Sequence, residues 1–430
     1  MKLHKRLLNV GLLIFWVMSA MAEGGSNSPY TRYGFGHLSD QSFGNSKAMG
    51  GIAYGLREGL QINAANPASY SVVDSLTFLF DAGMSLQNCN FHNPESGKRT
   101  NAKNSTFDYI AMQFRLNKRL GFTAGFLPYS IVGYNMSETG DVPNSEDQYG
   151  ATTAAMQTYS GEGSVQQVFV GLGYKVFNNL SIGANLSYLY GNAIHMSSLT
   201  FSNTNASKSV LAKEFKVNDY KLDLGLQYTQ SLGKKHKLNL GLVYSYGHDI
   251  NGKGYSYKET YMVESNYPLT QTVDTIQNGF GLPHSFGAGF TYVYNNRLTV
   301  GMDYTLQKWA DVKFFNKEGQ FNDRTKISLG AEYRPNPIGR NYFNRVRYRA
   351  GAYYSDPYAK VDGKEGAREY GVSFGFGFPL EMYQGRSILN ISGQYVKVSP
   401  KVKGMLEENY LRINVGLTFN DRWFMKWKVE

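Results

Sequence analysis

The chain has little of what enzymes and nucleic-acid-binding proteins need. It contains one cysteine in 430 residues, Cys89, which lies in a predicted loop, so no internal disulfide can form. Neither a His-Glu-x-x-His nor a Gly-x-Ser-x-Gly motif occurs, and the seven histidines are scattered. Only His248 and His284, which flank one long predicted loop, lie close enough to suggest a hydrolytic pair. We therefore predict no enzyme activity, no catalytic residues, no metal and no cofactor.

Charge and hydrophobic runs are also sparse. The formal net charge is +11, but Lys and Arg form no cluster of the kind that nucleic acid requires, so we predict no nucleic-acid partner. One long apolar run occurs, over residues 7–18, and it is shorter than the roughly 20 residues of a membrane-spanning helix. A basic stretch precedes it and the small-x-small pattern Ala20-Met21-Ala22 follows. We predict a signal peptide over 1–22 that is cleaved before Glu23.

What the chain has instead is alternation of apolar with polar or small residues. In the last such segment, Leu411, Ile413 and Val415 have one parity and Arg412 and Asn414 the other. Successive side chains of a strand point to opposite faces, so the segment has one apolar and one polar face. Fourteen segments of this kind follow one another, starting near residues 76, 109, 120, 166, 180, 220, 238, 286, 298, 327, 346, 370, 389 and 411.

The connections between these segments indicate a membrane barrel. They are short after the second, fourth, sixth and eighth segments and long after the third, fifth and seventh, over 131–165, 191–219 and 247–285. Outer-membrane barrels have short periplasmic turns, longer outer loops and aromatic residues at both interfaces. A soluble β-sandwich has no reason to alternate short and long connections in this way. We predict an all-β, transmembrane, antiparallel up-and-down barrel of about 14 strands over 74–430, in the outer membrane of a diderm bacterium.

The segment 23–73 has a different composition from the rest of the chain. It is rich in Gly, Ser, Asn and Tyr, it lacks alternation, and it includes Gly50-Gly51 and Asn66-Pro67-Ala68. A flexible tail would have more charge and fewer aromatic residues. We therefore predict that this segment folds into the lumen as a plug or hatch, with Gly50, Gly51, Asn66, Pro67 and Ala68 as hatch residues.

A plug-like segment that carries Asn66-Pro67-Ala68, followed by fourteen strands, resembles the FadL-type family of outer-membrane transporters. The ending Asn420-Asp421-Arg422-Trp423-Phe424 also resembles FadL-like proteins. The resemblance implies passive uptake of hydrophobic or amphipathic molecules such as fatty acids, past the hatch and out through a kink in the third strand. Pro128 lies in the third predicted strand and is the candidate for this kink. A simple strand end at Pro128 explains the proline as well.

The chain also departs from that family. Transporters of this type present an apolar groove in the outer loops, whereas the predicted loops here are polar, for example over 137–157 and 197–208. Other FadL-like barrels are subunits of secretion or assembly machines, such as the shuttle barrel of type IX secretion. The alternative function is therefore a non-transporting accessory barrel whose partners are other outer-membrane barrels or lipoproteins, with membrane lipid around it. A third hypothesis is an open diffusion porin, and a lumen filled by the plug would argue against it.

Several ionisable residues have the parity of the lumen. Arg345, Arg347 and Arg349 follow one another at a spacing of two. Arginine holds a carboxylate through two parallel hydrogen bonds, which suits the head group of a fatty acid. The candidate ligand-binding residues are Arg115, Arg347, Arg349 and Arg412. The alternative is a structural network in which these arginines pair with Asp303, Glu332, or plug acids such as Asp40 and Glu58.

Overall fold

The computed structural model describes residues 25–143, 152–203, 206–262, 268–382 and 385–422. The predicted signal peptide and Trp423-Phe424 of the C-terminal motif lie outside these ranges. The fold is a closed, antiparallel barrel of fourteen strands, as predicted from the alternation. Its strands are β2 (Thr77–His92), β3 (Arg99–Arg115), β4 (Leu120–Pro143), β5 (Thr152–Lys175), β6 (Leu180–Phe201), β7 (Lys208–Ser231), β8 (His236–Ser245), β13 (Ser285–Tyr294), β14 (Leu298–Gln307), β15 (Arg324–Tyr333), β16 (Arg347–Ser355), β19 (Ala367–Met382), β20 (Gly385–Pro400) and β21 (Glu407–Arg422).

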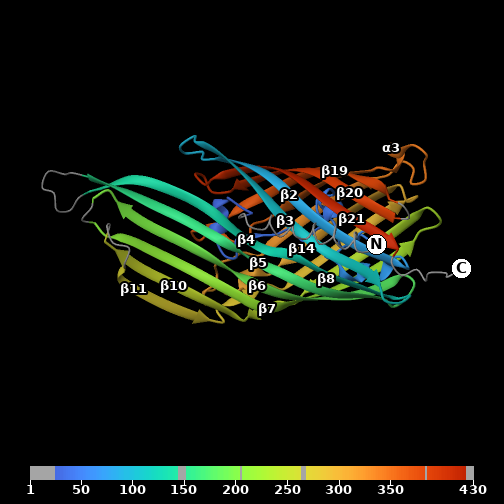
Figure 1. Ribbon diagram of the computed structural model, residues 1–430, viewed down its shortest axis with the longest axis horizontal. Helices are drawn as coiled ribbons and strands as arrows, with labels where there is room; N and C mark the ends of the chain where they lie inside the picture. The colour runs from blue at the N-terminus through green and yellow to red at the C-terminus, as the bar shows by residue number, and fades with distance from the viewer. Residues whose placement is uncertain (1–24, 144–151, 204–205, 263–267, 383–384, 423–430) are drawn as a thin grey trace, which may run out of the picture.

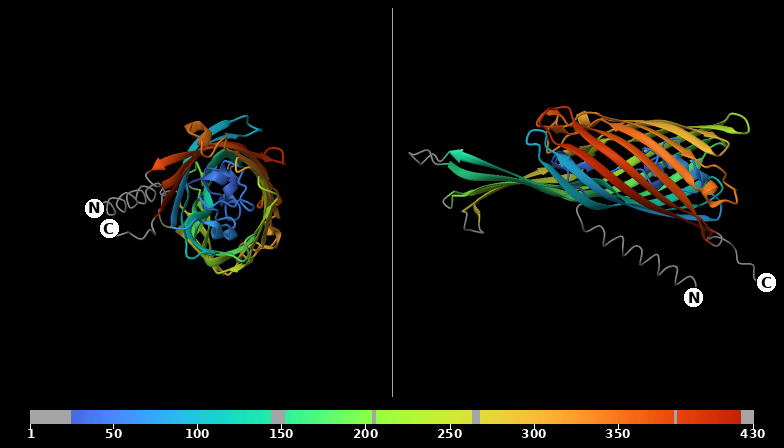
Figure 2. Two further views of the ribbon diagram at one scale, coloured as in Figure 1. Left: turned by 90° about the vertical axis from the view of Figure 1, so that its right-hand side faces the viewer. Right: turned by 90° about the horizontal axis from the view of Figure 1, so that it is seen from above.

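The barrel closes where its first strand pairs with its last. Thr77 of β2 lies opposite Arg422 of β21 at one end, and His92 lies opposite Glu407 at the other. Figures 1 and 2 show the resulting tube, with the long hairpins protruding from one end only. Because outer-membrane barrels have short turns on the periplasmic side, the end at Thr77 is periplasmic and the protruding end is external.

The alternation places apolar side chains on the outside of the wall. Leu411 and Ile413 of β21 are 55% and 47% exposed, whereas Asn414 and Thr418, of the other parity, are buried inside. The apolar parity is exposed in the same way on other strands, for example at Leu186 of β6. This apolar outer band over a polar interior is the surface of a barrel that spans a lipid bilayer.

None of the described helices is long and apolar enough to cross a membrane.

The long outer connections are largely strands, which differs from the loops that we expected over 131–165, 191–219 and 247–285. The hairpins β4–β5 and β6–β7 continue far beyond the barrel rim, and β10 (Gly252–Tyr261) and β11 (Pro268–Gln277) form a third hairpin beside them. Pairing of β10 with β7 joins all three into a six-stranded sheet. We refer to this sheet outside the barrel as the extension. Both of its faces lie outside the membrane, so these strands carry Ser, Thr and Asn in place of the apolar alternation.

Cys89 is also placed differently from the prediction. It lies in β2 and is buried beside Val396 and Tyr410. The remaining elements outside the plug are short: β9 (His248–Ile250), β12 (Phe280–Leu282), η3 (Trp309–Asp311), α3 (Tyr342–Arg345), β17 (Lys360–Val361) and β18 (Lys364–Glu365).

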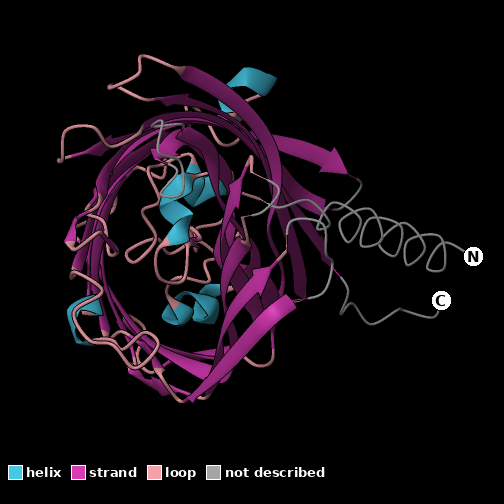
Figure 3. Ribbon diagram, turned by 90° about the vertical axis from the view of Figure 1, so that its left-hand side faces the viewer, coloured by secondary structure: helices cyan, strands magenta, loops and turns pink. Residues whose placement is uncertain are grey.

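The described part of the N-terminal segment fills the lumen. Residues 25–73 contain η1 (Pro29–Arg32), β1 (His37–Leu38), α2 (Gly44–Lys47) and η2 (Pro67–Val72), joined by turns. Figure 3 looks along the barrel and shows these helices and loops enclosed by the wall. We call residues 25–73 the plug.

Candidate functional site

The Asn66-Pro67-Ala68 tripeptide fixes the end of the plug to the wall. The Asn66 side chain accepts a hydrogen bond from the backbone N–H of Ala68 (3.1 Å) and so caps η2. Its amide group also donates to the carbonyl oxygens of Tyr54 (2.8 Å) and Leu226 (3.3 Å), which links a plug turn to β7. Asn66 and Ala68 are completely buried. These predicted hatch residues therefore contact the wall directly.

Gly50 and Gly51 form a turn that lies flat against the opposite wall. Gly50 has a φ of +65°, and a Cβ atom there would lie 2.6 Å from the carbonyl oxygens of Leu329 and Ala352. Only glycine accepts both this dihedral angle and this close approach. The Gly50 N–H donates to the Ser373 hydroxyl at 3.0 Å. The close fit makes this turn a fixed point of the plug.

The helix α2 is held to β3 by a stacked ring pair and an ion pair. Phe43 stacks on Tyr109 with the ring centroids 3.9 Å apart, and the Tyr109 hydroxyl accepts a hydrogen bond from the Gly44 N–H (2.9 Å). Lys47 lies 2.7 Å from Asp108, and both side chains are nearly buried. This ion pair could not be predicted from the alternation, because Asp108 lies at an irregularity in the pairing of β2 with β3.

Two of the candidate ligand-binding arginines are occupied by carboxylates of the protein. Arg347 lies 2.6 Å from Glu58 of the plug and 3.5 Å from Glu332 of β15. Arg349 lies 2.7 Å from Glu332 and also donates to the Asn390 side chain at 2.6 Å. The side chains of both arginines are almost fully buried. This arrangement is the structural network that we considered as the alternative to a ligand-binding site, and it attaches the plug to β16.

The other two candidate arginines lie far apart. Arg115 donates to the backbone carbonyls of Asn117 (2.9 Å) and Lys118 (2.6 Å) in a periplasmic turn. Arg412 donates to the Gln87 side chain at 3.2 Å and lines an internal cavity. The structure therefore does not bring the four predicted ligand-binding arginines together.

The outer mouth of the barrel is closed by aromatic side chains around Phe35 of the plug. Phe35 is 1% exposed and packs against Phe215, Trp309 and Phe314, with ring centroids 5.2 to 5.9 Å apart. We call seven buried aromatic residues of this cluster the outer seal: Phe35, Phe215, Phe280, Trp309, Phe315, Phe321 and Tyr358. The sequence showed the Arg32-Tyr33-Gly34-Phe35-Gly36 motif but not its partners, which come from separate outer connections.

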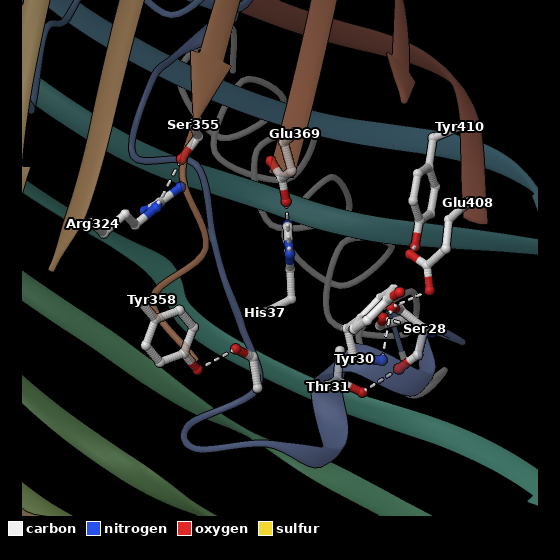
Figure 4. Close-up of polar contacts among 12 residues, drawn as sticks. Ser28, Tyr30, Thr31, His37, Arg324, Ser355, Tyr358, Glu369, Glu408 and Tyr410 are labelled. Carbon is white, nitrogen blue, oxygen red and sulfur yellow. Dashed lines mark hydrogen bonds and ion pairs between the residues drawn. The ribbon is translucent and has the colours of Figure 1, made fainter. Parts of the chain in front are cut away.

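Polar contacts around the outer seal attach the plug to the barrel, as Figure 4 shows. The Ser28 hydroxyl donates to Glu408 of β21 at 2.7 Å, and Tyr410 donates to the same carboxylate at 2.7 Å. The Tyr358 hydroxyl donates to the carbonyl oxygen of Gly36. The first turns of the plug are therefore bonded to both the last strand and an outer connection.

The wall has a gap between β3 and β4. Their pairing stops at Ile110 and Phe126, although β4 continues to Pro143. Pro128 lies just beyond this point, where the pairing of β4 with β5 is also irregular. Because β4 does not end at Pro128, a simple strand end does not explain this proline.

The plug fills this gap. Its short strand β1 pairs with β4 through Leu38 and Ser130, and the Gln41 side chain donates to the carbonyl oxygen of Pro128 at 3.2 Å. The gap in the ladder is therefore closed by the plug and not by β3.

A polar cavity of about 260 Å³ lies behind the gap, between the plug and the wall. The ionisable residues that line it are His37, Asp40, Lys47, Asp108, Lys221, Asp223, Asp303, Arg324, Lys326, Glu369 and Arg412. Both acidic and basic groups line the cavity, so it suits water or a polar group better than a hydrocarbon chain.

Two ionisable side chains of the plug that line this cavity have shifted pKa values. Enclosure away from bulk water lowers the pKa of His37, which lies 3.8 Å from Glu369. Enclosure would raise the pKa of Asp40, but the ammonium groups of Lys326 and Lys47 outweigh it, and this pKa is lowered. His37 is therefore mainly neutral and Asp40 ionised at neutral pH. Among the residues that the structure describes, no group of three or more His, Cys, Asp or Glu is placed to hold a metal ion.

Comparisons with known proteins give one family and a set of similar folds. The family model BamG matches residues 3–430. No curated protein sequence matches the chain. Similar solved structures include the toluene transporter TodX of P. putida (16% identity, TM-score 0.60, 90% of this chain and 100% of that one). A FadL homologue of Pseudomonas aeruginosa has 13% identity and a TM-score of 0.60 over 89% of this chain and 98% of its own. At these identities the likeness concerns the fold, and it agrees with the FadL-type architecture expected from the sequence.

Proposed function

The chain belongs to the BamG family, and from that premise we propose that it is a non-transporting accessory barrel subunit of an outer-membrane protein assembly or secretion complex. The family name hints at assembly. The observation that carries the proposal is the fixed plug. Arg347 binds the plug carboxylate of Glu58, Asp108 binds Lys47, and the outer seal buries Phe35. A barrel whose lumen is closed at several levels acts through its surfaces.

The extension supplies such a surface outside the membrane. It contains six strands, it protrudes from the external end only, and it belongs to the same continuous sheet as the barrel wall. Transport through the lumen does not require a β-sheet that extends far outside the membrane. In a complex, such a sheet presents a large docking area. Its polar composition fits an interface formed with water-soluble domains or surface lipoproteins.

The experiment is purification from native outer membranes in mild detergent, followed by mass measurement of the intact particle. The proposal expects a stoichiometric complex with at least one other outer-membrane protein. It also expects depletion of the chain to lower the amount of other folded outer-membrane proteins. A monomer whose loss changes only the uptake of a small molecule would contradict the proposal.

A second candidate, uptake of a hydrophobic or amphipathic molecule such as a fatty acid, is favoured by the gap between β3 and β4. The gap borders the cavity that Arg412 lines, and the Arg412 guanidinium has no carboxylate within ion-pair distance in the described part of the chain. Uptake of a labelled fatty acid should then fall with Arg412→Ala and stay unchanged with Arg115→Ala, because Arg115 lies at the periplasmic end of β3 and bonds to turn carbonyls. Equal uptake by Arg412→Ala and the unmodified chain would remove this candidate.

We also propose that residues 1–22 are removed on export. The support is the sequence pattern that ends in Ala20-Met21-Ala22. Intact-mass measurement of the protein from outer membranes should give a chain that begins at Glu23. A chain that retains Met1 would contradict cleavage.

A further inference from the structure

The extension has edges, which the closed barrel lacks. In the described part of the sheet, β4 forms one edge of the extension and β11 the other. An unpaired edge presents a row of N–H and C=O groups to which another strand can bind, and proteins usually block such edges. The two edges of the extension differ in how far they are blocked.

The edge at β4 is covered and charged. The plug strand β1 pairs with it at Ser130 and Ile131, and the Thr31 hydroxyl donates to the carbonyl oxygen of Gly133 and accepts its N–H, each at 3.2 Å. Farther out, Glu138 and Asp141 place two negative charges on the strand. Plug contacts and charge together block this edge.

In the described part of the chain, no plug strand pairs with the edge at β11, and residues 269–277 carry one charge. Nine of the ten residues of β11 are exposed, and among the described strands it pairs with β10 alone. Its single charged residue is Asp274, and it contains no lysine or arginine. Pro268 and the irregularity at Thr260 and Tyr261 lie only at the outer tip. The strand is also rich in residues that favour β-structure: Thr270, Thr272, Val273, Thr275 and Ile276.

Two hydrogen bonds at the base of the hairpin show which backbone groups face the free edge. The Asn278 N–H donates to the carbonyl oxygen of Gly252 (2.9 Å), and the Asn218 N–H donates to that of Asn251 (3.3 Å). In an antiparallel ladder, bonded residues alternate with residues whose N–H and C=O point away. The even-numbered residues of β11 therefore bond to β10. The odd-numbered residues inward of the irregularity direct their backbone groups outward: Gln271, Val273, Thr275 and Gln277.

We propose that the free edge of β11 binds an extended segment of a partner protein as an added β-strand outside the membrane. The N–H and C=O groups of these four residues, at strand spacing, match the backbone of a polypeptide, which is how strand addition gives affinity. The near absence of charge on β11 leaves no basis for recognising an anionic lipid or polysaccharide. This inference rests on the proposed role in a complex and names the contact.

Hydrogen exchange of single amides tests this contact, on the complex from native membranes and on the chain separated from it. In the separated chain, the odd-numbered amides of β11 should exchange fast and the even-numbered amides slowly. In the complex, the odd-numbered amides should slow by on the order of tenfold or more, because each gains a backbone hydrogen bond. Odd-numbered amides that exchange equally fast in both samples would overturn the inference while leaving the proposed function intact.

A backbone substitution separates strand addition from side-chain contact. Val273→Pro removes an N–H that the ladder with β10 does not use, so β11 keeps its internal pairing. Val273→Thr keeps the N–H and the branched side chain, and it is the matched control. Val273→Pro should abolish the protection and the association while Val273→Thr keeps both, and unchanged even-numbered amides should show that β11 remains folded. Association that survives Val273→Pro would contradict strand addition.

Cross-linking identifies the chain that binds to β11. A photoreactive residue in place of Gln271 should cross-link to an extended segment of a different protein. An adduct with a second copy of this chain would overturn the partner that we propose. A chain that purifies alone would contradict both the proposed function and this inference.

Discussion

Arg347 of β16 lies 2.6 Å from Glu58 of the plug, with 5% of the Arg347 side chain exposed. The wall arginine that a fatty acid would need is thus held by the plug itself. Burying a charge without a partner is strongly unfavourable, so each member of this pair constrains the other. The remaining partner of Arg347, Glu332, also serves Arg349. Removal of Glu58 therefore leaves two buried arginines sharing one carboxylate.

Glu58→Ala should loosen the plug. The expected loss is about 2 kcal/mol in the free energy of local opening, which is less than for a fully buried pair because Glu58 is one-third exposed. Hydrogen exchange of the amides over 50–66 measures it. Glu365→Ala is the control, since Glu365 pairs with Lys401 in an exposed site and should contribute less than about 1 kcal/mol. Equal exchange in both variants would show that the Arg347 pair does not hold the plug.

Gly50→Ala should displace the turn that fits against β15 and β16. The added Cβ would lie 2.6 Å from two carbonyl oxygens at a φ of +65°, so we expect a cost of about 1–3 kcal/mol. Gly393→Ala is the control, because nothing lies within 4 Å of its Cβ position. The measurement is the temperature at which the barrel unfolds in detergent. A Gly50→Ala protein as stable as Gly393→Ala would contradict the fit described here.

Phe35→Ala should open the outer seal. Truncation of a phenylalanine that is 1% exposed costs about 3–5 kcal/mol and leaves a cavity among the rings of the seal. Single-channel recordings in planar bilayers should then show brief openings that the unmodified protein lacks. Phe343→Ala, at a side chain of α3 that is 67% exposed in the periplasmic connection between β15 and β16, should stay silent. Silence in both variants would mean that the seal is not what closes the outer mouth.

Acidification should weaken the plug at His37. Its pKa is lower in the folded plug than in a released plug, where it returns to its ordinary value. A released plug therefore binds more protons, and the stability contributed by neutral His37 is lost as the pH falls through about 6.5. Exchange over residues 37–39, corrected for its intrinsic pH dependence, should rise between pH 7.5 and 5.5 in the unmodified protein and not in His37→Gln. An equal rise in both would assign the effect to another group.

The strands were predictable because a bilayer imposes one rule on every one of them. Leu411 and Ile413 face lipid, and Asn414 faces the lumen, as their parity requires. The extension was not predictable in this way, since both faces of β10 and β11 lie outside the membrane and the apolar alternation is lost. Cys89 was placed in a loop for the same reason: the outer part of β2 lies beyond the apolar band.

The sequence predicted which ionisable residues face the lumen, but it did not predict which of them pair with one another. The spacing of Arg347 and Arg349 placed both side chains in the lumen, and Glu58 was one possible partner. Which acid meets which base depends on how the plug folds, and no periodicity encodes the path of residues 25–73. The ion pair of Lys47 with Asp108 and the burial of Phe35 depend on that path in the same way.

The most direct test of the proposed function is the mass of the intact particle from native outer membranes, measured in mild detergent without overproduction of the chain. We expect the chain in a stoichiometric complex with another outer-membrane protein and with its plug amides protected from exchange. A monomeric chain that carries a bound hydrophobic molecule would contradict the account and support a transporter.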